Sequence, residues 1–110
     1  YPVEIQDRVK KILDKELPGY DLIETSKTIL GIIDLTTLEG ADNTKKVREL
    51  CHKASSFSTK GKDIPNVAAI CVFPTLVKTA RECFMNTPIH IAAAAGAFPS
   101  GQAPLKIKIE

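Results

Sequence analysis

The sequence lacks an excess of charge of either sign. Its 110 residues include 15 basic and 13 acidic side chains, which give a formal net charge of only +2 at pH 7. The lysines are scattered and do not form the basic stripe that nucleic-acid-binding surfaces usually carry. We therefore expect no nucleic-acid partner.

The sequence also lacks a long apolar run. No stretch approaches the roughly 20 apolar residues that a membrane-spanning helix requires. The first residues do not show the order of charged, apolar and small residues that marks a secretory signal. We therefore expect no membrane partner and a cytoplasmic location. Because the chain begins with Tyr1 and not with methionine, we interpret it as lacking a segment that was removed or never included.

Cysteine is scarce, and Cys51, Cys71 and Cys83 are widely spaced. No Cys or His partner stands at the close spacing of a zinc site, so we expect no metal. His52 follows Cys51 within an expected helix, where neighbouring side chains point in different directions, so the two do not form a catalytic pair. We interpret Cys51 and Cys83 as small buried side chains in a reducing compartment.

The spacing of apolar residues predicts alternating helices and strands within at most one domain. Helical periodicity recurs in four segments, at residues 3–17, 21–28, 44–55 and from Pro74 onward. Strand-length apolar runs occur at residues 32–40, 67–73 and 89–95. This order predicts an α/β fold whose strands are parallel, covered on both faces and joined by helices in right-handed crossovers.

The end of the first expected helix and the last segment of the chain are assigned separately. The first helix is expected to include Leu17 on its apolar side and to stop at Pro18. Residues 104–110 alternate as a strand would, but Pro104 also suits a helix start. Both interpretations of this last segment stay open, because so short a stretch cannot be assigned by its period alone.

Asp34 is the residue that most needs an explanation. It stands within the run 32–40, and burying a carboxylate without a partner is costly. One interpretation is functional. The other, of about equal weight, is that Asp34 lies at the strand end and caps the following loop with its side chain.

The chemistry of a parallel sheet collects at the carboxyl ends of its strands. We expect Asp34, residues 71–74 and the loop 96–101 at or near that edge. Because side chains alternate along a strand, Cys71 is expected to face a ligand if Asp34 does.

Four segments, taken in order, carry a resemblance to a known family. They are residues 33–38 (IDLTTL), 50–54 (LCHKA), 67–74 (VAAICVFP) and 95–102 (AGAFPSGQ). Together they resemble deoxyribose-phosphate aldolase. The resemblance implies a TIM (β/α)8 barrel, of which this chain is expected to be the amino-terminal part. The chain is then a single partial domain, with introductory helices at residues 1–30 and about three βα units at residues 31–110.

The resemblance implies an aldehyde-lyase that reversibly cleaves 2-deoxy-D-ribose 5-phosphate to acetaldehyde and D-glyceraldehyde 3-phosphate, without metal or cofactor. A lysine amine forms a Schiff base with the substrate, which requires a neutral amine and hence a lowered pKa. Asp34 matches the family's first-strand aspartate, which positions and relays protons beside the lysines. Leu38 and Cys71 match positions that line the pocket near the small aldehyde.

The chain departs from the family in length. A whole barrel needs about 250 residues, and the family's Schiff-base lysine, its partner lysine, a second aspartate and the phosphate-binding residues lie on later strands. We therefore assign the catalytic lysine to no residue of this chain and expect the chain to be inactive alone. The alternative is a non-catalytic fragment or interaction module. In both cases the open sheet edges predict a partner, either a further copy of the chain or the remainder of the barrel.

Three other features receive weaker or structural interpretations. Ser26, Lys27 and Thr28 look like a reactive-lysine motif, but a solvated helix face is the better explanation. The loop 96–101 suggests a small phosphate or nucleotide binder, yet it lacks the glycine fingerprint of such sites. His90 is interpreted as a structural histidine, either in a barrel floor or beneath a helix.

Overall fold

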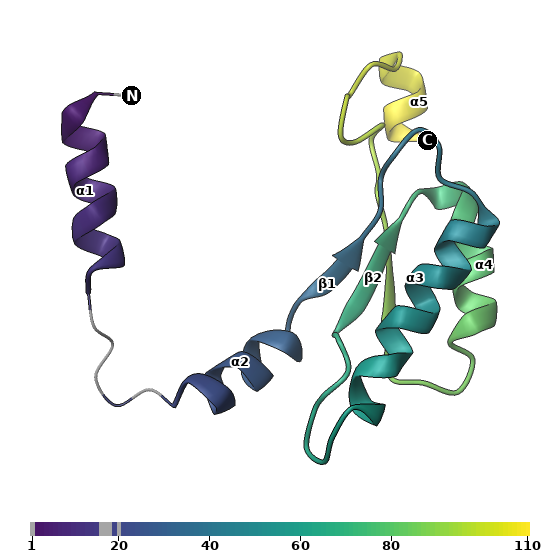
Figure 1. The fold of residues 1–110 in the computed structure, drawn as a ribbon. Coiled ribbons are helices and arrows are strands. Elements are labelled where there is room, and N and C mark those ends of the chain that lie inside the picture. The colour runs from purple at the N-terminus through teal and green to yellow at the C-terminus, as the bar shows by residue number, and fades with distance from the viewer. Residues whose placement is uncertain (1, 16–18, 20) are drawn as a thin grey trace.

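The structure, a computed structural model, describes residues 2–15, 19 and 21–110. Its elements are, in order, α1 (Val3–Leu13), α2 (Leu22–Leu30), β1 (Asp34–Thr36), α3 (Thr44–Ser56), the 3-10 helix η1 (Phe57–Thr59), β2 (Ala69–Val72), the 3-10 helix η2 (Pro74–Leu76), α4 (Val77–Cys83), β3 (His90–Ala93) and α5 (Leu105–Ile109). Figure 1 shows their course along the chain.

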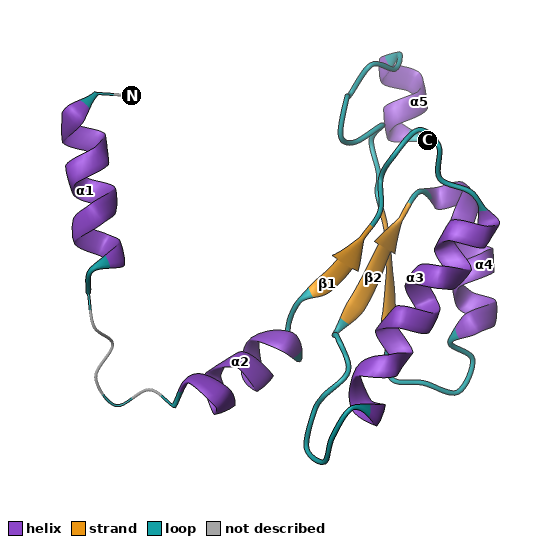
Figure 2. Ribbon diagram, viewed as in Figure 1, coloured by secondary structure: helices purple, strands orange, loops and turns teal. Residues whose placement is uncertain are grey.

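The three strands form one open, parallel sheet in the order β1-β2-β3. A helix stands between each strand and the next, so the predicted α/β fold with parallel strands is confirmed. Helices α3 and α4 pack against each other and lie on one face of the sheet (Figure 2). On the other face Asp34, Thr36 and His90 are exposed. The expectation of strands covered on both faces is therefore wrong for the described residues.

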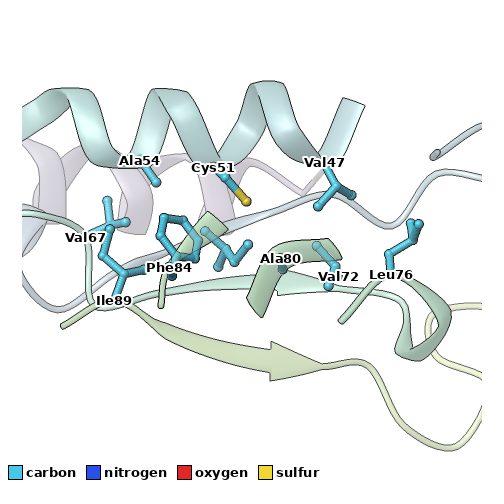
Figure 3. Packing of buried hydrophobic residues seen from close by; sticks show 10 residues of the cluster. Val47, Cys51, Ala54, Val67, Val72, Leu76, Ala80, Phe84 and Ile89 are labelled. Atoms are coloured by element: carbon cyan, nitrogen blue, oxygen red, sulfur yellow. The ribbon is translucent and has the colours of Figure 1, made fainter. Parts of the chain in front are cut away.

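The core lies between this sheet and its two helices (Figure 3). Its buried apolar side chains are Val47, Cys51, Ala54, Val67, Ile70, Val72, Leu76, Ala80, Phe84 and Ile89. Val47, Cys51 and Ala54 repeat at helical spacing on α3, and Ile70 and Val72 repeat at strand spacing on β2. Each large apolar side chain buried in this way contributes about 1.5–3 kcal/mol relative to an exposed one.

The first strand is shorter than its apolar run. The strand expected at residues 32–40 is reduced to Asp34–Thr36. The N–H groups of Ile32 and Ile33 donate to the carbonyl of Ile29, at 3.1 and 3.2 Å, and extend the last turn of α2. The strand can therefore begin only after these two residues.

The helices α1, α2 and α5 contain no buried residue. On α1 the apolar side chains of Ile5 and Val9 are each 49% exposed. Leu17 and Pro18, which were expected to extend and end the first helix, lie outside the described residues. The segment after Pro104, which allowed a strand or a helix, is a helix. In the described part of the chain, no helix is long and apolar enough to cross a bilayer.

Candidate functional site

The parallel register aligns side chains in rows across the three strands. The first row is Asp34, Ala69 and His90, and the second is Thr36, Cys71 and Ala92. Between the rows, Leu35, Ile70 and Ile91 belong to the core or pack against it. Because side chains alternate along a strand, the two rows project from the side opposite to α3 and α4. We call this side the open face.

Asp34 is an exposed carboxylate at the start of β1. Its Oδ2 accepts a hydrogen bond from the hydroxyl of Thr36, at 3.0 Å. The alternative in which Asp34 ends its strand and caps the following loop is therefore wrong, and so is the expectation that it lies at the carboxyl edge, because Asp34 begins its strand. Asp34 lies level with Ala69 and His90, the first residues of the other two strands, and hence at the amino end of the sheet.

Cys71 and Leu38, the two expected pocket residues, occupy different places. Both are half-buried. Cys71 lies in the row of Thr36 on the open face, the same face as Asp34. Leu38 lies in the loop that follows β1, beyond the carboxyl end of that strand and outside the two rows.

His90 is exposed on the open face, in the same row as Asp34. This position excludes the expected alternative beneath α3 or α4. Neighbouring strands lie about 4.8 Å apart, so the backbones of Asp34 and His90 are separated by roughly twice that distance, with the small side chain of Ala69 between them. The sequence contains no signal for this juxtaposition, because it depends on the pairing register of all three strands.

A hydrogen-bond network fixes the loop between β1 and α3. The carboxylate of Asp42 accepts hydrogen bonds from the Thr37 hydroxyl, at 2.8 Å to Oδ1, and from the Glu39 N–H, at 3.0 Å to Oδ2. The ammonium of Lys46 lies 2.9 Å from Asp42 Oδ1, and it also pairs with the Glu39 carboxylate. The Asp42 side chain is only 1% exposed. A buried, charged acceptor therefore holds together residues from the strand end, the loop and the helix.

The contacts of Asp42 set its charge state. Burial is the largest single influence and acts to raise its pKa, but hydrogen bonds from Lys46, the Glu39 N–H and Thr37 together lower the pKa below its ordinary value. The contacts with Glu39 and Asp42 in turn raise the pKa of Lys46. Both groups are therefore charged at neutral pH, and they anchor the loop that carries Leu38.

Part of the backbone in the loop after β3 is hydrogen-bonded within the loop itself. Gly96, Ala97 and Gly101 have positive φ angles of 66°, 59° and 68°. The N–H of Gly101 donates to the carbonyl of Ala97, at 2.8 Å, and closes a tight turn. We interpret this loop as a turn between β3 and α5.

No group of three or more His, Cys, Asp or Glu residues is placed to hold a metal ion within the described ranges. A comparison of the chain with profiles of known protein families finds no match. A functional assignment therefore depends on the residues of the chain and on their arrangement on the open face.

Proposed function

We propose that this chain is the amino-terminal part of a deoxyribose-phosphate aldolase with a TIM (β/α)8 barrel. The observation that carries the proposal is the open face, on which Asp34, Thr36 and Cys71 lie together. In such a barrel the helices form the outer ring, so the face opposite to α3 and α4 is the interior. The proposed substrate is a small phosphorylated sugar, 2-deoxy-D-ribose 5-phosphate, and the proposed reaction requires no metal or cofactor.

In the proposed reaction a lysine amine attacks the carbonyl carbon of the substrate. Water leaves, and the resulting protonated imine draws the electron pair of the breaking carbon–carbon bond toward its nitrogen. Asp34 is proposed to move protons beside that lysine. The Thr36 hydroxyl, which donates to Asp34 Oδ2 at 3.0 Å, would fix the orientation of the carboxylate. Cys71 and Leu38 are proposed to line the pocket that holds the acetaldehyde part.

The Schiff-base lysine is proposed to lie outside these 110 residues. The three described strands, with sequences DLT, AICV and HIAA, contain no lysine. Lys27 pairs with Glu24, and Lys46 pairs with Glu39 and Asp42. These contacts raise the pKa of both lysines, whereas an amine that attacks a carbonyl must be neutral. The chain is therefore expected to be inactive alone.

A non-catalytic interaction module is the second candidate. The observation that favours it is the sheet itself, because β1 and β3 each have one neighbour in the described part of the chain. A free strand edge presents unpaired N–H and C=O groups to which another chain can add. A module of this kind would bind a second copy of itself or another protein through these edges.

The test is aldol cleavage by a polypeptide in which this chain continues into a whole barrel. We expect release of acetaldehyde from 2-deoxyribose 5-phosphate, and a loss of at least about tenfold in turnover for Asp34→Asn, in line with proton-transfer groups. The matched control is Asp7→Asn, which neutralises an exposed carboxylate on α1 and should leave turnover unchanged. A barrel without cleavage activity, or full turnover in a folded Asp34→Asn protein, would favour the interaction module.

A further inference from the structure

Two of the cysteines lie together where α3 packs against α4. Cys51 is 2% exposed, and Cys83, the last residue of α4, is half-buried. Both line one surface cavity of about 330 Å³, together with Arg48, His52 and Ser55. Solvent and small molecules in this cavity therefore reach the Cys83 side more readily than the Cys51 thiol.

An ion pair joins the two helices beside these thiols. Arg48 lies one turn before Cys51 on α3, and Glu82 directly precedes Cys83 on α4. The guanidinium of Arg48 lies 3.1 Å from the Glu82 carboxylate. Such an exposed pair adds little stability, but it shows that the helices approach closely at this level. On the inner side Cys51 belongs to the buried core, with its sulfur directed toward the sheet (Figure 3).

The Cys51 thiol is shielded from water and lines the same cavity as Cys83. Burial raises the pKa of the Cys51 thiol to about 12. The neighbouring Cys83 thiol adds to this rise in pKa, and the positive charge of Arg48 opposes it. The shared cavity and the packing of α3 against α4 place these two side chains beside each other, the arrangement from which a disulfide can form.

We propose that Cys51 and Cys83 are a redox pair that closes to a disulfide between α3 and α4 by exchange with a low-molecular-weight disulfide. The Cys83 thiolate bonds to one sulfur of that reagent, and the other sulfur leaves as a thiolate. Cys51 then attacks the Cys83 sulfur, closes the protein disulfide and releases the second thiolate. The two thiol protons pass to these leaving groups, so the protein loses two electrons and the reagent gains them.

The different exposure of the two cysteines sets the order of these steps. The nucleophile is the thiolate and not the thiol, so the half-exposed Cys83 reacts first and the buried Cys51 closes the bond slowly. In a reducing compartment the disulfide is transient, as redox-sensing disulfides are. Its effect is to join the two helices that cover the sheet.

The test is oxidation of the native chain with oxidised glutathione at mildly alkaline pH. Free thiols are then alkylated, and peptides are mapped without reduction. We expect a single cross-linked pair through Cys51 and Cys83, with Cys71 alkylated, and reopening of the bond by dithiothreitol. Cys71→Ser is the matched control, because Cys71 lies on the open face and its loss should leave the yield unchanged.

Two variants separate the steps. Cys83→Ser should abolish the cross-link, and Cys51→Ala should stop the reaction at a glutathione adduct on Cys83. Circular dichroism checks that each variant is folded. The proposal is overturned by a cross-link through Cys71, by an adduct on Cys83 that never resolves in the unaltered chain, or by the absence of any modification at Cys83.

Discussion

At the scale of single residues, Asp42 holds the loop between β1 and α3, because its buried carboxylate accepts hydrogen bonds from the Thr37 hydroxyl and the Glu39 N–H. Asp34 could be selected from sequence because it interrupts a strand-like run, whereas the face that it shares with Cys71 depends on the pairing register as well as on alternation along each strand. The Asp42 network could not be predicted, because its partners Thr37, Glu39 and Lys46 meet only once the loop has folded. The alignment of Asp34 with His90 could not be predicted either, because it depends on the pairing register of the three strands.

Replacement of Asp42 tests its role in the β1–α3 loop. We expect Asp42→Asn to lower the free energy of unfolding by about 1–3 kcal/mol, because buried donors lose a charged acceptor. The folded-state pKa of Asp42 is lowered, so its contribution is present at neutral pH and is lost as the pH falls through that value. Chemical denaturation should therefore show a difference between the two proteins that shrinks in acid. A difference that is absent at neutral pH contradicts the assigned role.

Cys51 predicts an alkaline loss of stability. Its pKa rises from 9.0 to about 12 in the folded chain. Between these values the unfolded thiol loses its proton while the folded one keeps it, so stability falls as the pH rises. Relative to Cys51→Ala, the reduced chain should lose an additional 1.4 kcal/mol or so per pH unit in this range. Arg48, His52 and Cys83, which line the same cavity as Cys51, and Glu82, which pairs with Arg48, are common to both proteins. If the free energy of unfolding depended on pH in the same way in both proteins, the burial assigned to the Cys51 thiol would be contradicted.

At the scale of elements, the sequence predicted the order of helices and strands better than their ends. Strand-length apolar runs and helical spacing located the three strands and the helices between them, because burial of the sheet against α3 and α4 selects apolar residues in these segments. The apolar run overstates the length of β1, because the N–H groups of Ile32 and Ile33 donate to the carbonyl of Ile29 in the turn after α2. Helix α5 was ambiguous because its five residues fit both periods.

A pair of identical substitutions tests which elements contribute to the core. Ile70 of β2 is 0% exposed, whereas Ile5 of α1 is 49% exposed. We expect Ile70→Ala to cost about 2–5 kcal/mol in the free energy of unfolding. Ile5→Ala should change it by less than about 0.5 kcal/mol. Equal losses in urea denaturation would contradict the separation of α1 from the core.

At the scale of the whole molecule, the chain leaves an unusual amount of surface open. Its accessible surface is 8681 Å², whereas a compact protein of 12.0 kDa exposes about 6,000 Å². Parallel sheets normally have both faces covered, but here the open face and the outer edges of β1 and β3 are uncovered in the described chain. We propose that the remainder of a barrel or a further copy of the chain covers them.

We propose that the open face belongs to an aldolase whose Schiff-base lysine lies outside these 110 residues. The most direct measurement is borohydride reduction in the presence of acetaldehyde, followed by peptide mapping, on this chain alone and on a polypeptide that continues it into a whole barrel. We expect one specifically ethylated lysine in the longer polypeptide, beyond residue 110, and none within the chain. A specific adduct on a lysine of the chain itself, or no specific adduct in the whole barrel, would contradict this proposal.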